Sequence, residues 1–301
     1  MKIFIRFLLP LFLLALPAQA KFRVVATTPD LGAIGEEIGG DQIDLFTLAR
    51  PTEDPHFVDA KPSFIVRLNR ADALIEGGAE LEAGWLRPLL EGARNSKLDT
   101  GKPGRIAASE GVTLLDVPAA LDRSQGDIHA AGNPHYLTDP LNAKIVAAHI
   151  AAAFSEIDPG AANTFAANLK SFETRLDAKM AAWQRQLAPY RGRPIVTYHN
   201  YWIYFGRRFE FPMDLFLEPK PGIPPTPAHL AEVIMKMKAQ DIKLIAVQPY
   251  QNRKTAEAVA NRTGAVVLDW PSFPGGKGAE TYEAWIDGIV NSVVQGFGSA
   301  K

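Results

Sequence analysis

The apolar residues between Asp158 and Ala188 recur at spacings of three and four, which is the period of an amphipathic α-helix. These apolar positions are Phe165, Leu169, Phe172, Leu176, Met180, Trp183 and Leu187. Asp158 and Pro159 suit the N-cap and the first position of the helix, and Pro189 disfavours its continuation. At 1.5 Å per residue, such a helix is roughly 45 Å long. One ordinary domain does not cover that length, so the pattern predicts a rigid helix that joins two lobes. A long helix inside a single domain is the alternative.

Short apolar runs alternate with amphipathic segments on both sides of this helix. Before it, we expect strands at residues 22–27, 42–48 and 73–75, with helices following Thr28, Pro62, about Trp85 and Pro140. After it, we expect extended segments at 194–198, 211–217, 243–247 and 265–268, and helices at 227–239, 253–262 and 280–297. Strands that alternate with helices imply parallel βαβ units.

The expected fold class is therefore α/β, with two lobes that are each a mainly parallel sheet flanked by helices, joined by one long backbone helix. Residues 21–157 form the expected N-terminal α/β lobe and residues 189–301 the C-terminal α/β lobe. Residues 158–188 form the connecting helix.

The first twenty residues have the pattern of a signal peptide. Lys2 and Arg6 precede an apolar core at residues 7–16, and residues 18–20 (AQA) have the small-residue pattern of a cleavage site. We therefore expect cleavage after Ala20 and a periplasmic mature protein. The cleavage point has no cysteine, so the pattern predicts a protein without a lipid anchor.

Composition narrows the chemistry. The chain has no cysteine, which excludes disulfides and thiolate metal ligands. With 32 basic and 33 acidic residues, the formal net charge is −1. No basic footprint for nucleic acid is present, so we expect no nucleic-acid partner.

Three of the six histidines lie where loops of the two predicted sheets should meet. They are found in residues 54–57 (DPHF), 132–136 (GNPHY) and 197–202 (TYHNYW). In parallel α/β sheets, ligands bind at the carboxyl ends of the strands, and imidazole is a good ligand for zinc and related metals. The pattern favours a joint metal site, although each histidine taken alone could be an ordinary loop residue.

The segment 133–140 (NPHYLTDP), preceded by 126–129 (GDIH), resembles the metal-binding segment of the solute-binding proteins of zinc and manganese ABC importers, the cluster A-I family. Residues 54–56 (DPH) and 198–201 (YHNY) are similar to the first and third ligand segments of that family, in the same order. The resemblance covers essentially the whole mature chain, including the long helix.

The resemblance implies four metal ligands. His56 and His135 would come from the N-terminal lobe and His199 from the C-terminal lobe, and Asp269 matches the place of a late carboxylate ligand. The residues after Asp269 depart from the family pattern, and a water or the Asp54 carboxylate is the alternative fourth ligand.

His129, six residues before His135, has two readings. It is either a low-affinity ligand for an incoming ion, or a loop residue or hydrogen-bonding partner of a ligand.

Three imidazoles and one carboxylate fit Zn²⁺ as the transported ion, with Mn²⁺ as the alternative. The function implied by the resemblance is a periplasmic substrate-binding subunit, a monomer, which delivers the metal to an ABC permease in the inner membrane. It would not be an enzyme. A periplasmic zinc chaperone and a zinc-dependent hydrolase are the alternatives, although the chain has neither an H-E-x-x-H nor a G-x-S-x-G motif.

Overall fold

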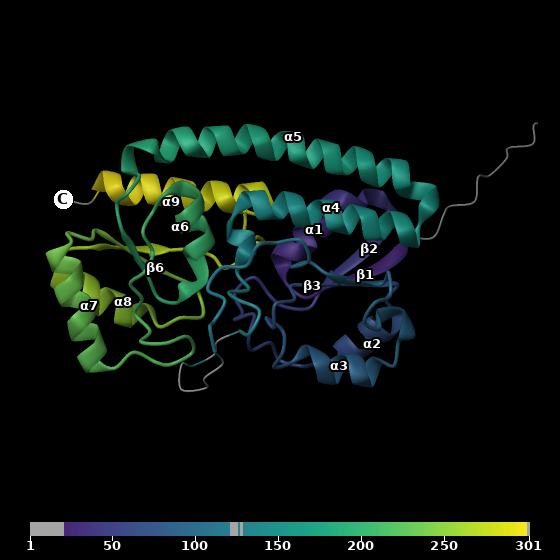
Figure 1. The fold of residues 1–301 in the computed structure, drawn as a ribbon, viewed down its shortest axis with the longest axis horizontal. Helices are drawn as coiled ribbons and strands as arrows, with labels where there is room; N and C mark the ends of the chain where they lie inside the picture. Colours follow the sequence, from purple (N-terminus) through teal and green to yellow (C-terminus); the bar gives the residue numbers. More distant parts are fainter. Residues whose placement is uncertain (1–20, 121–125, 127–128, 300–301) are drawn as a thin grey trace, which may run out of the picture.

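The computed structural model describes residues 21–120, 126 and 129–299, and it contains two parallel sheets under one long helix (Figure 1). The expected signal peptide, residues 1–20, lies outside the described residues. The first sheet has the order β2-β1-β3-β4, and its strands are β1 (Phe22–Ala26), β2 (Ile43–Thr47), β3 (Ala73–Glu76) and β4 (Arg105–Ala107). The second has the order β5-β6-β7, with β5 (Ile195–Thr197), β6 (Leu244–Val247) and β7 (Val266–Asp269). All pairings are parallel, which confirms the predicted fold class.

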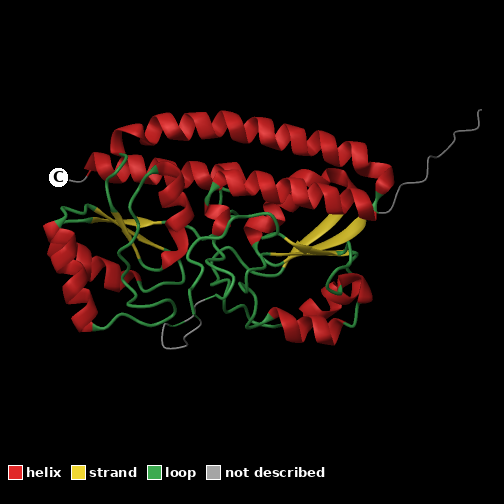
Figure 2. Cartoon of the chain, in the orientation of Figure 1, coloured by secondary structure: helices red, strands yellow, loops and turns green. Residues whose placement is uncertain are grey.

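Helices flank both sheets, as Figure 2 shows in red. In the N-terminal part they are α1 (Pro29–Gly39), α2 (Pro62–Arg70), α3 (Leu86–Ala93) and α4 (Pro140–Ile157). In the C-terminal part they are α6 (Ile203–Phe209), α7 (Pro227–Ala239), α8 (Arg253–Thr263) and α9 (Tyr282–Ser299). Gly264, with φ of 75°, ends α8, because glycine adopts that conformation without strain.

Two predicted features differ from the structure. The segment 211–217 forms no regular strand, and it lies along β5 through a parallel bridge between Phe216 and Thr197 and a few backbone hydrogen bonds. The predicted helix at 158–188 is divided into the 3₁₀ turn η5 (Pro159–Ala161), the helix α5 (Ala162–Leu187) and the 3₁₀ turn η6 (Ala188–Tyr190). Asp158 caps the first turn by accepting a hydrogen bond from the Gly160 N–H at 3.1 Å.

The apolar stripe of α5 packs on both halves of the molecule. Six of its seven predicted positions are buried, and Leu169 is partly buried against the same core. That core is continuous from β1, α1 and α4 through α5 to β6 and α9. In Figure 1, α5 runs along one side of the molecule above α4 and α9. The helix is therefore part of a shared core, although the exact lobe boundaries at 157/158 and 188/189 stay a prediction.

Polar contacts reinforce this packing. Arg175 of α5 pairs with Glu37 of α1 at 2.5 Å and with Glu283 of α9 at 3.2 Å. The Trp183 indole donates a hydrogen bond to Asp287 of α9 at 2.8 Å. Within the described part of the chain, none of the helices has the length and apolar character needed to cross a bilayer.

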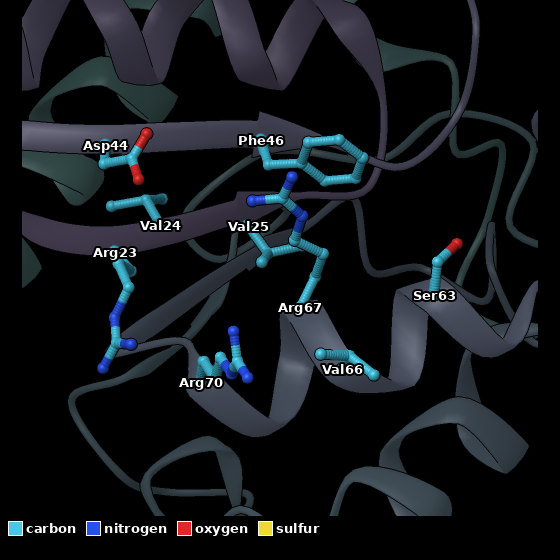
Figure 3. Close-up of a pocket in the computed structure, with 9 residues that line it drawn as sticks. All are labelled: Arg23, Val24, Val25, Asp44, Phe46, Ser63, Val66, Arg67 and Arg70. Carbon is cyan, nitrogen blue, oxygen red and sulfur yellow. The ribbon is translucent and has the colours of Figure 1, made fainter.

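A cleft of about 510 Å³ lies between α2 and the first sheet, and three arginines face it (Figure 3). Arg67 lies over the Phe46 ring at 4.5 Å, and Arg23 pairs with Asp72 at 3.6 Å. The third arginine, Arg70, is in the last turn of α2, where a cation interacts favourably with the helix dipole. Each of these arginines thus has a favourable interaction within the protein, which explains its presence in the cleft.

Candidate metal centre

Three loops bring three imidazoles together. His56 lies in the loop between β2 and α2, His135 directly precedes the 3₁₀ turn η4 (Tyr136–Thr138), and His199 follows β5 by two residues. The ring centroids are 5.0 Å apart for His56 and His135, 5.4 Å for His135 and His199, and 5.8 Å for His56 and His199. One nitrogen of each ring lies within 4.8 Å of the other two. The predicted meeting of these three residues is thus present in the structure.

Carboxylates hold two of the three rings. Asp54 Oδ1 lies 2.8 Å from His56 Nδ1, and Glu218 Oε2 lies 2.8 Å from His199 Nδ1. An ionised carboxylate only accepts hydrogen bonds, so each Nδ1 carries the proton and each Nε2 keeps its lone pair. This tautomer is the one in which Nε2 can bind a metal.

The Nε2 atoms of His56 and His135 are buried and have no hydrogen-bond partner among the described residues. Buried polar atoms are normally paired, so two unpaired ring nitrogens in one cluster indicate a site for a cation. Burial, followed by the neighbouring His56 and His199, lowers the pKa of His135 well below its usual value. The neutral form of His135, which is the form that binds a metal, is therefore favoured.

The histidine cluster also changes the pKa of the Asp54 carboxyl group. Burial by itself would raise its pKa, but the hydrogen bonds and charge of His56 outweigh burial and lower the pKa below its usual value. Asp54 also accepts the His56 backbone N–H at 3.0 Å. The carboxylate thus stays ionised and fixes both the backbone and the ring of His56.

Rigid surroundings position the three loops. The Tyr201 ring stacks on His135 with centroids 4.0 Å apart, and the Trp85 indole donates to the Pro55 carbonyl at 2.8 Å. The Tyr204 hydroxyl donates to the Asn133 carbonyl at 2.6 Å, so the His135 loop is tied to α6 of the other half. Tyr201, two residues after His199, therefore packs directly against the site.

Asp269, the predicted fourth ligand, does not lie beside the imidazoles in this structure, and its role as a ligand stays a prediction. Asp269 is the last residue of β7, its side chain is 72% exposed, and its carboxylate pairs with Arg253. The strand alternates, with Leu268 buried and Asp269 facing solvent. Among the described His, Asp and Glu residues, the group that could hold a metal consists of the three histidines. Asp54, the alternative, contacts Nδ1 of His56 and is not part of this group.

His129 lies against the cluster without joining it. Its ring stacks on His56 with centroids 5.3 Å apart and an interplanar angle of 27°. Burial, followed by the nearby His56 and His199, lowers its pKa to about 4. Residues 127 and 128 of the GDIH segment lie outside the described residues. The position fits a partner of His56 as well as a ligand for an incoming ion.

Sequence reasoning missed Glu218. It begins the proline-rich run 218–227, which looks like an ordinary surface loop and has no periodic signal. Its contact with His199 depends on a pairing between distant segments, which only the fold reveals.

The chain was compared with known proteins. The model of the family described as "Zinc-uptake complex component A periplasmic" matches residues 24–296. The iron-binding protein YfeA of Yersinia pestis is 27% identical over 288 residues, covering 92% of this chain and 87% of that protein. The manganese ABC transporter substrate-binding lipoprotein PsaA of Streptococcus anginosus is 25% identical over 248 residues, covering 81% of this chain and 77% of that protein.

Solved structures have the same fold. The crystal structure of ZnuA matches with a TM-score of 0.78 at 22% identity, covering 92% of this chain and 99% of that one. The Mn-bound periplasmic metal binding protein from Candidatus Liberibacter asiaticus matches with a TM-score of 0.76 at 21% identity, covering 91% and 99%. The family match includes all three histidine loops, and the chain therefore belongs to the family of the periplasmic component A of zinc-uptake complexes.

Proposed function

We propose that this chain is the periplasmic substrate-binding subunit of an ABC importer, and that it captures Zn²⁺ between its two lobes for delivery to an inner-membrane permease. The observation that carries the proposal is the group of three imidazoles in which one nitrogen of each ring lies within 4.8 Å of the other two. In addition, the Nε2 atoms of His56 and His135 are buried without a hydrogen-bond partner among the described residues. Names of the relatives include zinc, manganese and iron, so the choice of metal rests on the donor set. Three neutral nitrogen ligands favour zinc, whereas manganese favours oxygen ligands.

The charge of the site supports a divalent ion. The three ligands are neutral, and Asp54 and Glu218, which hydrogen-bond two of them, together supply two negative charges. These carboxylates would compensate the charge of a bound Zn²⁺ without contacting it, because they contact the histidine ligands. Water is our proposed fourth ligand, since Asp269 faces solvent.

Release follows from the distribution of the ligands. His56 and His135 belong to the N-terminal half and His199 to the C-terminal half, so a small tilt of one half would separate His199 from the other two. The continuous core beneath α5 resists a wide opening. We propose that small movements of the loops and lobes release the ion.

The alternatives differ in testable ways. The family consists of substrate-binding transport proteins and not of enzymes, which argues against the zinc-dependent hydrolase. A periplasmic zinc chaperone would have the same metal centre but would not require a permease.

Cleavage after Ala20 and a monomeric state remain parts of the proposal. The intact mass of the exported protein tests the cleavage, and light scattering tests the monomeric state.

The central experiment is a competition titration with Zn²⁺ and Mn²⁺ on the purified protein. We expect one zinc per chain, a preference for zinc over manganese, and at least a hundredfold weaker zinc binding in His135→Ala. The matched control is His149→Ala, since His149 lies in α4, outside the cluster. Equal zinc binding in wild type and His135→Ala would refute the proposed site. Zinc uptake that persists in cells without the permease genes would favour the chaperone.

A further inference from the structure

Glu218 reaches the metal centre through an irregular extension of the second sheet. After the bridge between Phe216 and Thr197, the Leu217 N–H donates to the Thr197 carbonyl and the Glu218 N–H donates to the Tyr198 carbonyl, each at 3.0 Å. The segment therefore runs parallel to the end of β5. As a result, Glu218 lies beside His199, and its Oε2 is 2.8 Å from Nδ1.

This contact is largely shielded from water. The side chains of Glu218 and His199 are 15% and 11% exposed. The Gly222 N–H also donates to Oε2, at 3.3 Å. Both residues line a cavity of about 360 Å³, together with Phe216 and Pro219. A charge-assisted hydrogen bond in such a site is stronger than one in open solvent.

Glu218 and His199 form in the C-terminal half the same carboxylate–Nδ1 contact that Asp54 and His56 form in the N-terminal half. Asp54 is two residues from its histidine and belongs to the same turn, whereas Glu218 is nineteen residues from His199. The geometry of His199 thus depends on a separate loop. His199 is also the ligand whose movement would open the proposed site.

We propose that Glu218 is a positioning residue that sets the zinc affinity of the site and its preference for zinc over harder divalent ions. The inference rests on the proposed function. By accepting the Nδ1–H, Glu218 holds His199 in the tautomer with Nε2 free and makes that nitrogen a stronger donor. Zinc gains more than manganese from a stronger nitrogen donor, because manganese favours oxygen ligands. Glu218 is not itself a ligand, since it lies outside the three-nitrogen group.

A purely structural role would give different results. If Glu218 only braced the loop at 218–222, its replacement would lower the thermal stability of the metal-free protein and weaken all metals equally. If it were a ligand, its replacement would change the coordination of the bound ion. The positioning role instead predicts unequal effects on two metals with unchanged coordination.

The test compares wild type, Glu218→Gln and Glu218→Ala in zinc and manganese titrations. Gln keeps a hydrogen-bond acceptor of the same size but removes the charge. Glu110→Gln is the matched control, since Glu110 is 71% exposed and lies 3.6 Å from His149 outside the centre. Thermal unfolding of the metal-free proteins and the visible spectrum of their Co²⁺ forms complete the set.

We expect Glu218→Gln to weaken zinc binding by about 10- to 100-fold and manganese binding by less, with unchanged metal-free stability and an unchanged Co²⁺ spectrum. Glu218→Ala should weaken zinc binding further, and Glu110→Gln should bind both metals like wild type. The inference is overturned if Glu218→Gln binds zinc like wild type, if zinc and manganese binding weaken by the same factor, or if the Co²⁺ spectrum reports a lost ligand. These outcomes all require that wild type binds zinc, so they are distinct from failure of the proposed function, in which wild type itself does not bind.

Discussion

Arg208 of α6 forms a two-pronged contact with Asp139, which precedes α4 in the other half of the molecule. Its Nε and Nη2 donate to Oδ1 and Oδ2 at 2.7 and 2.8 Å. Asp139 also caps α4 by accepting the Leu141 N–H at 2.9 Å, and it lies only four residues after His135. We predict that this ion pair holds the His135 loop against the C-terminal half, so Arg208→Met should destabilise the metal-free protein.

The expected magnitude follows from burial. Exposed ion pairs contribute about 0–1 kcal/mol, and removal of one partner of a buried pair costs about 3–5 kcal/mol. The side chain of Asp139 is 10% exposed, but that of Arg208 is 31% exposed, and Asp139 keeps its capping contact. We therefore expect Arg208→Met to lower the free energy of unfolding by about 2 kcal/mol, between the two limits.

The assay is urea-induced unfolding of the metal-free protein, read as a shift of the midpoint at constant slope. Arg87→Met is the matched control, because the Arg87–Glu91 pair is 84% and 65% exposed, and its loss should cost under about 0.5 kcal/mol. A double-mutant cycle with Asp139→Asn isolates the coupling between the two side chains. An effect of Arg208→Met no larger than that of Arg87→Met would refute the reasoning.

Three further predictions concern α5, Asp269 and His129. Phe172→Ala should lower the free energy of unfolding by about 3–5 kcal/mol, because Phe172 lies fully buried on the inner face of α5. Lys170→Ala, on the exposed face of the same helix, should change this free energy little, and denaturant unfolding checks both. Asp269→Ala should leave the zinc dissociation constant within about twofold by competition titration, because the side chain faces solvent; a loss approaching that of His135→Ala would restore it as a ligand. The lowered pKa of His129 means that the unfolded chain binds its proton more readily, so this residue's contribution to stability is complete above about pH 6.5 and is lost as the pH falls toward about 4. The stability of metal-free wild type should therefore fall more steeply over that window than that of His129→Gln, and parallel profiles would contradict this.

Local patterns predicted the parts of the fold that local physics determines. The spacing from Phe165 to Leu187 depends only on helix geometry, and the structure confirms the helix. The three histidine loops follow strands or precede helices with clear start signals, so their meeting at one edge of the sheets was also predictable. Strand β4 was missed, because its three residues are too few for a period to emerge.

Asp269 and Glu218 show what the sequence could not determine. Whether a residue at the end of a strand faces the centre depends on pleat and on the following turn. Here Leu268 and Trp270 are buried, so Asp269 faces outward. Glu218 approaches His199 through backbone pairing with β5, a contact between segments about twenty residues apart. Both outcomes depend on how strands and loops are aligned with one another in the fold, which the residue type at one position does not reveal.

The most direct test of the metal centre is X-ray absorption at the zinc edge, on protein loaded with one equivalent of Zn²⁺, alongside His135→Ala. The account predicts three imidazole ligands at about 2.0–2.1 Å in wild type, and one fewer, or no bound zinc, in His135→Ala. A wild-type spectrum with fewer than three imidazoles, or one that is unchanged in His135→Ala, would contradict it.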